Sequence, residues 1–256
     1  MKSAVAPLRR EKLHDRLTRQ IALGIMQGAI GQGELSTEGE LCDHFQVSRT
    51  ILRESVKVLA AKKLVELRPK TGMLVRPRSE WNLVDPDLLG WLCEAGVDDR
   101  FVSDLCEVRL IVEPAAAELA ALRGTQKEID EILQWYQLIE SHTDDEAARL
   151  DADRNFHATI FAACHNVFLE QMNAAVGLAL RATQQIGVHL PEVIEESVLA
   201  HKEVAECIAK RDSAAARDAM VRLIKQSTGH IERVLARETI GPKRYSGHRA
   251  KAASRK

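Results

Sequence analysis

The sequence is poor in aromatic residues and in cysteine, and it has no long apolar run. Aromatic residues make up only 4% of the 256 positions, which disfavours a β-sandwich or a barrel, because strands favour aromatic and β-branched side chains. The five cysteines are scattered and odd in number, so neither a disulfide framework nor a zinc ribbon is expected. No apolar segment approaches the roughly 20 residues of a membrane span, and the first residues lack the apolar stretch of a secretory signal. We therefore expect a mainly α-helical, cytoplasmic protein without a membrane partner.

Charge is distributed unevenly along the chain, although the formal net charge is only −1. Residues 1–80 carry 15 Lys and Arg against 9 Asp and Glu, whereas residues 81–240 carry 15 against 28. A basic head on an acidic body indicates that the head alone meets a polyanion such as DNA, with a chance imbalance as the alternative. Residues 240–256 are rich in Lys and Arg and contain no acidic residue, and we expect them to form a disordered tail.

The basic head begins with the pattern of three helices. Apolar residues recur at helical spacing over residues 13–30. Thr37 and Glu40 then form a capping box, which predicts a short helix over residues 38–45. Ser48 is placed to cap another helix after a tight turn, and two short helices joined in this way are typical of a helix-turn-helix.

The second of these short helices has the character of a recognition helix. Arg49, Thr50, Arg53 and Lys57 lie away from its apolar stripe, with the first two in its first turn. That turn is the part of a recognition helix that meets base edges, and an arginine can donate two hydrogen bonds to guanine. Two short β runs follow, at residues 64–67 and 73–76. They flank a basic turn that ends in Lys70, Thr71 and Gly72, and they predict a wing at the edge of a DNA groove. A protein-binding three-helix domain is the alternative.

These residues resemble the DNA-binding domain of the GntR superfamily. The motifs that carry the resemblance are Gly33-x-Leu35-x-x-Glu38-x-x-Leu41 and Val47-Ser48-Arg49-x-x-x-Arg53-Glu54, followed by the hairpin with Gly72. The chain departs from the family pattern at Ser36, where proline is usual, and at Gly39, where some members have a further arginine that contacts DNA. Together with the resemblance, the pattern predicts DNA contacts by Glu38, Ser48, Arg49, Thr50, Arg53, Lys57, Lys70, Thr71 and Gly72.

The sequence of the acidic body predicts an antiparallel all-α bundle. Apolar residues step by three and four between Asp98 and Arg123, which predicts one long amphipathic helix. The apolar stripe consists of Leu105, Val108, Val112, Ala115, Leu119 and Leu122. Further helical patterns occupy residues 126–141, 144–164, 166–188, 192–210 and 213–239. No strand-like alternation separates them, and the segment around Trp81–Asp87 is taken as the junction with the head.

Three polar residues of the body lie on apolar helix faces. Asp153 and His157 are four residues apart and share one face, and His201 lies within the apolar stripe of another predicted helix. An acid and two imidazoles inside a bundle must pair, neutralise or bind something. The set suits Zn, Ni or Mn, and two ligands four residues apart can chelate one ion. Satisfied core histidines, one bonded to Asp153, are the alternative.

This region is similar to the FCD ligand-binding domain of FadR-type GntR regulators. The similarity rests on Arg109-x-x-x-Glu113, Asp153-x-x-Phe156-His157 and His201. It implies a divalent metal that receives the carboxylate of a small effector and is held by Asp153, His157 and His201. The fourth ligand position of the family is Leu223 here, and His230 lies two turns further along, so the polar trio binding the effector directly is the other interpretation.

Two arginines bear on the effector. Arg109 and Glu113 are candidates for the effector site, with a structural ion pair as the alternative. Arg181 lies in a helix of small and apolar residues and is a candidate carboxylate clamp, or else a surface charge. The segment from Trp81 to Trp91 looks most like regulators of sugar-acid catabolism of the galactonate-operon type, which implies a sugar acid as the effector. An aromatic acid, a dicarboxylate or a folate-like acid is the alternative.

The sequence therefore predicts a homodimeric transcriptional regulator. A winged helix-turn-helix over residues 10–78 would bind double-stranded operator DNA as a repressor. A helical domain over residues 85–239 would bind a small carboxylate effector and the second copy, followed by the tail at 240–256. The alternative from another class is a metal-dependent all-α enzyme with an appended nucleic-acid-binding module. Against it, the sequence offers no paired general acid and base and no phosphate loop.

Overall fold

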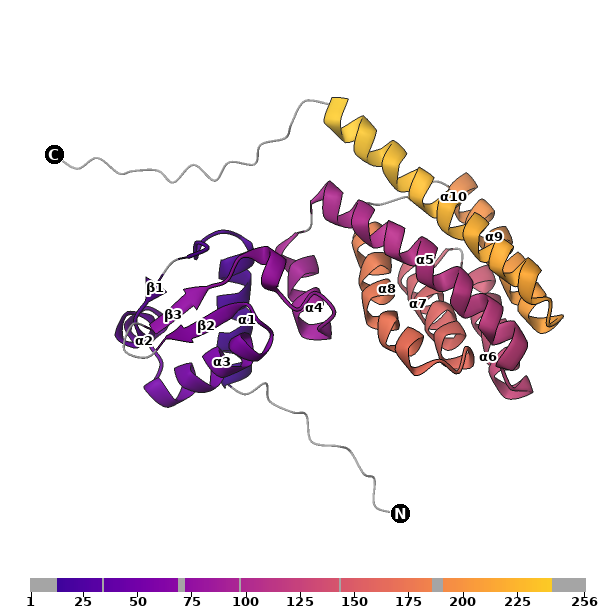
Figure 1. Ribbon diagram of the computed structural model, residues 1–256. Helices are drawn as coiled ribbons and strands as arrows, with labels where there is room; N and C mark the ends of the chain where they lie inside the picture. The colour runs from indigo at the N-terminus through magenta and orange to yellow at the C-terminus, as the bar shows by residue number, and fades with distance from the viewer. Residues whose placement is uncertain are drawn as a thin grey trace, which may run out of the picture. The chain divides into compact units, whose positions relative to one another are not determined.

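The computed structural model describes residues 13–33, 35–68, 72–96, 98–142, 144–185 and 191–240 (Figure 1). The structure is mainly α, with a small sheet near the N-terminus, as the sequence predicted. It divides into two compact units. The first comprises residues up to Leu105 together with Val167–Ala182, and the second comprises Cys106–Asn166 together with the chain from Thr183.

The first unit contains the predicted helix-turn-helix. Helix α1 (Leu13–Met26) packs against α3 (Arg49–Ala61), and α2 (Glu38–Phe45) also contacts α3. The capping box is present, because the hydroxyl of Thr37 accepts from the backbone N–H of Glu40 at 3.2 Å. In return, the backbone N–H of Thr37 donates to the Glu40 carboxylate at 2.9 Å. These reciprocal hydrogen bonds fix the start of α2.

The wing is a three-stranded antiparallel sheet with strand order β1-β3-β2. Its strands are β1 (Leu35–Ser36), β2 (Val65–Arg68) and β3 (Gly72–Val75), and Val65 pairs with Val75 in register. Gly72 has φ +104°, a left-handed conformation that glycine adopts without strain, and this explains a glycine at the end of the turn. Residues 69–71 at the tip, including Lys70 and Thr71, lie outside the described residues.

A fourth helix, which the sequence did not predict, belongs to the first unit. Helix α4 (Pro86–Ala95) begins at the N-cap Asp85 after a short 3-10 turn, η1 (Arg78–Glu80), and it packs on α1. The ammonium of Lys62, at the C-cap of α3, donates to both oxygens of Asp85, at 2.7 and 2.9 Å, and to Asp87 at 2.8 Å. Lys62 thus joins the end of the recognition helix to the start of α4.

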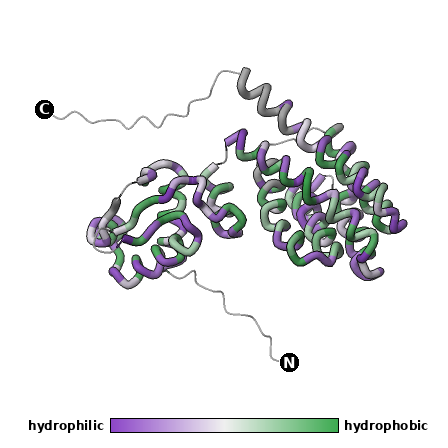
Figure 2. The backbone as a smooth tube through the Cα atoms, viewed as in Figure 1, coloured by the Kyte–Doolittle hydropathy of each residue, from purple (hydrophilic) through white to green (hydrophobic). Residues whose placement is uncertain are grey.

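The helical body contains the predicted helices. They are α5 (Asp99–Arg123), α6 (Gln126–Ser141), α7 (Glu146–Ala163), α8 (Val167–Gln185), α9 (Pro191–Ala209) and α10 (Ser213–Ile240). In the second unit, α6 packs against both α7 and α9, and α9 packs against α10. The described part of this unit contains no strand. Hydrophobic and hydrophilic residues alternate along these helices, as expected for a bundle with a buried core (Figure 2).

Helix α5 faces the core with a different side from the one that its apolar pattern indicated. The apolar stripe includes Val108 and Leu122, which are 36% and 59% exposed, and neighbouring Ile111 is 73% exposed. The buried face of α5 within the second unit is formed by small residues and one ion pair: Cys106, Arg109, Glu113, Ala116, Ala117, Ala120 and Ala121. Alanines allow neighbouring helices to approach closely, so the core side of α5 is lined by small side chains and not by the large apolar ones.

By its contacts, the segment from residue 85 to 105 groups with the winged helix-turn-helix, as does most of α8. The domain limits at residues 10–78 and 85–239 remain a prediction. The basic tail falls outside the described residues from position 241 onward. Within the described chain, no helix has both the length and the apolar character that a membrane crossing needs.

Candidate functional site

The N-terminal half of α3 presents polar side chains to solvent. Ser48 caps the helix, and its hydroxyl accepts from the backbone N–H of Ile51 at 3.4 Å. Arg49 and Thr50 follow in the first turn, and both are exposed. The buried residues Leu52, Val56 and Leu59 anchor the opposite face in the core.

Arg53 is held in place by a carboxylate of the preceding helix. Its Nε and Nη2 donate to the two oxygens of Glu38 at 2.9 and 3.0 Å, a two-point contact that fixes the plane of the guanidinium. The hydrogen bond from Arg53 lowers the pKa of Glu38, so the pair stays ionised at neutral pH. The Arg53 side chain remains 61% exposed, and its free edge is open to a base or a phosphate.

The other predicted DNA-contacting residues are mostly exposed. Lys57 is exposed and pairs with Glu54 at 2.8 Å, one turn before it. Gly72 opens β3 at the base of the wing turn. Gly39 lies in α2, where an added Cβ would come no closer than 3.9 Å to any neighbouring atom, so nothing in the fold prevents a side chain there.

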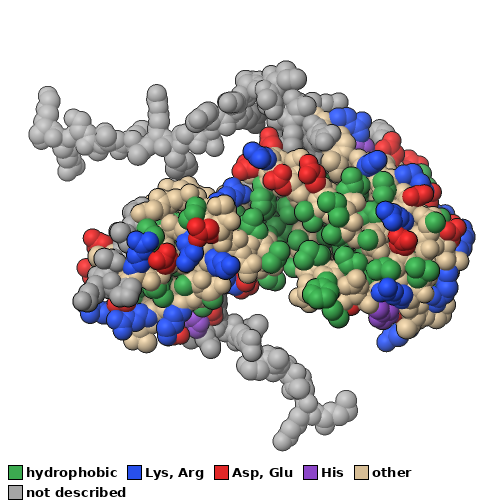
Figure 3. Space-filling view, viewed as in Figure 1, with side chains coloured by type: hydrophobic (Ala, Val, Ile, Leu, Met, Phe, Trp, Pro, Cys, Tyr) green, Lys and Arg blue, Asp and Glu red, His purple; other side chains and the backbone are tan. Residues whose placement is uncertain are grey.

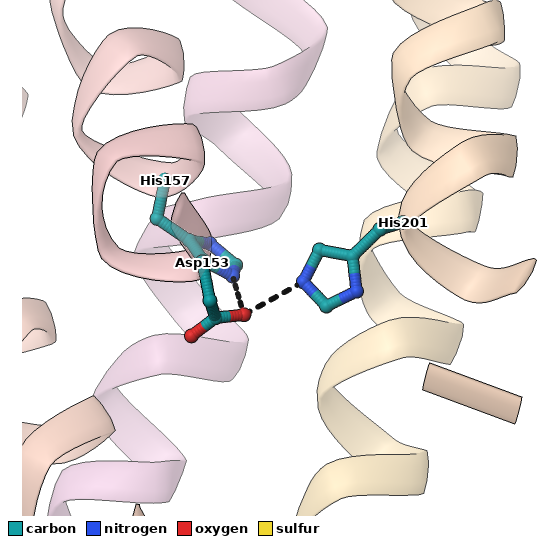
Figure 4. A group of neighbouring side chains, drawn as sticks. All are labelled: Asp153, His157 and His201. Atoms are coloured by element: carbon teal, nitrogen blue, oxygen red, sulfur yellow. Dashed lines mark ion pairs between the residues drawn. The ribbon is translucent and has the colours of Figure 1, made fainter. Parts of the chain in front are cut away.

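A second group of polar side chains lies inside the body. Asp153 and His157 come from α7 and His201 from α9, and their side chains point toward one another (Figure 4). The Oδ1 of Asp153 is 2.9 Å from Nε2 of His201 and 3.9 Å from Nε2 of His157. Both imidazoles are buried, whereas Asp153 keeps 16% of its side chain exposed. One potential ligand atom from each residue lies within 4.8 Å of the others.

The outer nitrogens of both imidazoles are already used. The Nδ1 of His201 lies 2.7 Å from the carbonyl oxygen of Ser197, which can only accept, so this nitrogen carries a proton. The Nδ1 of His157 contacts the carboxylate of Glu113. When the imidazoles are neutral, each Nε2 therefore carries no proton and directs its lone pair toward the carboxylate of Asp153. The carboxylate also accepts hydrogen bonds, so neither group can donate to the other. A proton or a cation has to separate these groups, and imidazoles oriented in this way by outer hydrogen bonds are typical of metal ligands.

A buried ion pair extends the cluster. The Nε of Arg109 donates to Glu113 at 2.6 Å, and both side chains are at most 2% exposed. Burial raises the pKa of Glu113, but the charge of Arg109 and the contact with His157 outweigh burial and lower it to about 2. Burial likewise opposes ionisation of Asp153, yet the hydrogen bond to His201 and the nearby cations lower its pKa to about 2. Both carboxylates are thus ionised at neutral pH.

The charges of these linked side chains do not sum to zero. With neutral imidazoles, Glu113 and Asp153 contribute two negative charges, and Arg109 contributes one positive charge. A buried site with this excess requires one further positive charge, which a protonated imidazole or a metal ion supplies. A divalent ion leaves one positive charge over, and the site then attracts an anion. The Nη1 of Arg109 is also buried without a hydrogen-bond partner.

Five of the predicted effector residues are thus linked by successive side-chain contacts. The contacts run from Arg109 through Glu113 and His157 to Asp153 and His201. The sixth predicted effector residue, Arg181, is exposed and belongs to the first compact unit, and it is not one of these linked residues.

Two other positions were weighed for the metal. Leu223 is buried and apolar, and Nε2 of His230 lies 3.4 Å from the carboxylate of Glu196. Phe156, to which the sequence assigned no role, stacks edge-on against both imidazoles, at 5.6 Å from the ring centre of His157 and 5.2 Å from that of His201. The sequence could have indicated this role, because Phe156 directly precedes His157.

A winged helix-turn-helix with an exposed arginine-bearing recognition helix, joined to a helical domain with a buried polar cluster, defines a transcriptional regulator that binds DNA. Comparison with known families agrees. Residues 11–75 match the gntR family of bacterial regulatory proteins, and residues 104–226 match the FCD domain. The chain belongs to the GntR family and carries an FCD domain.

Individual relatives are regulators as well. The chain is 32% identical to the galactonate operon transcriptional repressor of Escherichia coli K12 over 86% of its own length and 97% of that protein. It is 28% identical to the Uxu operon transcriptional regulator of the same organism, over 86% of both chains. The solved structure of Lar, which controls the expression of the Listeria monocytogenes agr system, shares the fold at a TM-score of 0.63. It has 19% identity and covers 88% of this chain and 99% of that one.

These findings decide between the two classes of function that the sequence left open. The relatives at 32% and 28% identity are transcriptional regulators, and they give no support to an enzyme with an appended DNA-binding module. Regulators of this family bind operator DNA through the winged helix and small effectors through the FCD domain.

Proposed function

We propose that this protein is a repressor of a catabolic operon and that a small carboxylic acid bound in the helical domain releases it from its operator. The observation that carries the proposal is the buried Asp153–His157–His201 cluster, with the unpartnered Nη1 of Arg109 beside it. Sugar acids are the favoured effectors, because relatives along nearly the whole chain regulate the galactonate and Uxu operons.

A divalent metal fits the donor set of this cluster. Asp153, His157 and His201 would hold Zn, Ni or Mn, since each imidazole is fixed by an outer hydrogen bond and directs Nε2 toward the carboxylate. Three protein ligands leave coordination positions open, and a bound metal supplies there a Lewis acid that accepts a carboxylate. The chain's own part is to neutralise and orient the acid, with Arg109 as the buried cation and Glu113 as the anchor of both Arg109 and His157.

Release from DNA requires that the effector favour one arrangement of the protein over another. An acid that binds more tightly to the form in which the recognition helices are misplaced shifts the population toward that form. The shift is limited by the difference between its affinities for the two forms.

The proposal also includes a homodimer that pairs through the helical domain. The exposed apolar residues Val108, Ile111 and Leu122 follow one side of α5, and hydrophobic side chains cover a broad area of the body's visible face (Figure 3). Monomeric proteins rarely expose apolar patches of this kind. Two α5 helices related by a two-fold axis at Ala115 would place Val108 of one copy opposite Leu122 of the other, so the stripe is self-complementary.

The test is release of the protein from DNA of its own promoter region. Purified protein, loaded with Zn²⁺ or Ni²⁺ or treated with a chelator, is titrated with galactonate while operator binding is followed by fluorescence anisotropy. We expect release by the acid with the metal-loaded protein. His157→Ala should keep operator affinity, which shows that the variant is folded, and lose both the bound metal and the response. An unchanged response in this variant would refute the assigned site.

A further inference from the structure

Buried guanidinium nitrogens without a hydrogen-bond partner point to one more residue. Among the arginines that the structure describes, they occur in Arg76, Arg109 and Arg149. Arg109 belongs to the contacts around Asp153 described above. Arg76 lies next to the wing, and its Nη1 donates to Glu80 at 2.6 Å. Arg149 remains, and its Nε is buried and unpartnered.

Arg149 lies on the same stripe of α7 as the cluster. It precedes Asp153 by four residues, and His157 follows after four more, so the three positions lie along one side of the helix. One turn separates each from the next, about 6 Å along the axis. The side chain of Arg149 is partly exposed, in contrast to the fully buried Arg109. Arg149 therefore lies one turn nearer the start of α7 than the ligand atoms.

The natural partners of Arg149 are otherwise engaged. Asp145, four residues before it, caps α7 by accepting from the backbone N–H of Ala148 at 3.1 Å. Asp153, four residues after it, lies against His201 at 2.9 Å. Opposite charges at this spacing ordinarily pair on a helix, yet Arg149 has no ion pair with any described residue. By contrast, Arg154 on the same helix pairs with Asp151.

A buried guanidinium N–H without an acceptor destabilises the ligand-free protein, because the group has lost its water. An acceptor supplied by a ligand removes this penalty. Arg149 thus matches a second anchoring point for a molecule whose carboxylate lies at the Asp153 cluster, one turn away. Such a molecule has to carry further oxygen acceptors at a distance from its carboxylate.

On the basis of the proposed function, we propose that Arg149 selects the length of the effector. It binds the distal hydroxyls of an extended polyhydroxy acid, and it leaves short 2-hydroxy acids without this contact. The effector class is therefore a polyhydroxy acid long enough to span one helix turn, about 6 Å. Arg149 is a specificity residue, and the Asp153 cluster together with Arg109 supplies the binding that all carboxylates share.

Calorimetric titration of the metal-loaded full chain tests the selection, with galactonate as the long acid and L-lactate as the short one. The variant Arg149→Met keeps the apolar stem, and Arg154→Met is the matched loss of a charge on the same helix. We expect Arg149→Met to weaken galactonate binding at least tenfold and to change lactate binding less than twofold. Arg154→Met should change neither. Equal losses for both acids, or no loss for galactonate, would overturn the proposal.

The melting temperature without ligand provides a readout that does not depend on the acid. Removing an unpartnered buried donor should raise the melting temperature of Arg149→Met by about 2 °C relative to wild type. A fall of that size would identify Arg149 as a structural residue and overturn its role in selection. A wild-type protein that binds neither acid would instead count against the proposed function, while the sign of the melting shift would still decide on Arg149.

Discussion

Arg53 shows how the position of a single side chain is determined by its neighbours. Its spacing after Ser48 predicted that it faces solvent on the recognition helix, and the structure places it there. The two-point contact with Glu38 was not predictable, because the two residues lie on different helices. This contact orients the guanidinium before DNA arrives and so reduces the entropy lost on binding.

We expect Arg53→Ala to weaken operator binding by about 1–3 kcal/mol, the worth of a two-point contact to a base. The measurement is anisotropy titration with promoter DNA at fixed salt. Lys57→Ala is the control, since loss of a phosphate contact lowers affinity for all sequences alike and reduces the salt dependence by about one ion. Equal affinities of Arg53→Ala and wild type would remove Arg53 from the interface.

For the inner cluster too, some residues were predictable from the sequence and others required the fold. Asp153, His157 and His201 were predicted from helical spacing, because charged groups on apolar stripes are conspicuous. The link from Glu113 to His157 joins two helices and required the fold. Arg149 was not predicted, although it precedes Asp153 by the same four residues that separate Asp153 from His157. An arginine near the start of a helix is usually an exposed surface charge.

At the level of elements, the sequence predicted most helices and both main strands of the wing. Capping residues such as Thr37, Ser48 and Thr125 define helix starts through purely local hydrogen bonds. Helix α4 was missed because it is only 10 residues long and follows directly on the segment taken as the junction, although its buried residues Leu88, Leu89 and Leu92 share one face. The inward face of α5 was misjudged because helical spacing shows that a stripe exists and does not show which neighbour covers it.

The contact between α3 and α4 is the element-scale feature with the clearest energetic consequence. The side chain of Lys62 is 11% exposed and that of Asp85 is 20% exposed, so both are largely shielded from water. Lys62→Met should lower the free energy of unfolding by about 1–3 kcal/mol, because Asp85 is left buried without its cation. Urea unfolding followed by circular dichroism measures the loss. Lys57→Met, which removes a lysine of an exposed pair, should change stability by less than about 1 kcal/mol.

The same contact gives a pH dependence of known sign. Burial raises the pKa of Asp85, but the hydrogen bond from Lys62 and those from the backbone of α4 outweigh burial, and the pKa lies below its ordinary 3.8. The folded state therefore binds this proton less readily than the unfolded chain does. The stabilisation is complete above about pH 4 and is lost as the pH falls through the lowered value. The stability difference between wild type and Lys62→Met should narrow as the pH falls from about 4 through the lowered pKa of Asp85, and a constant difference would contradict this origin.

For the whole molecule, the decisive question is whether two copies pair through α5. Ile111→Asp places a charge in the middle of the exposed stripe, and it should convert a dimer to a monomer and weaken binding to a two-half-site operator by more than tenfold. Light scattering coupled to size-exclusion chromatography measures the mass. Leu199→Asp is the matched control, because Leu199 is likewise largely exposed, at 59%, but lies on α9. A change of mass in both variants, or in neither, would place the interface elsewhere.

Helix α5 has its polarity reversed, with an ion pair toward the interior and large apolar side chains toward the outside. In the proposed dimer a second copy covers this segment, so the concentration of the regulator would affect its own stability. The exposed stripe of α5 is solvated in a single copy, and the melting temperature should rise as the protein concentration increases. A cell that makes few copies would then hold a less durable repressor, and the strength of repression would depend on the amount of protein more steeply than operator affinity alone dictates.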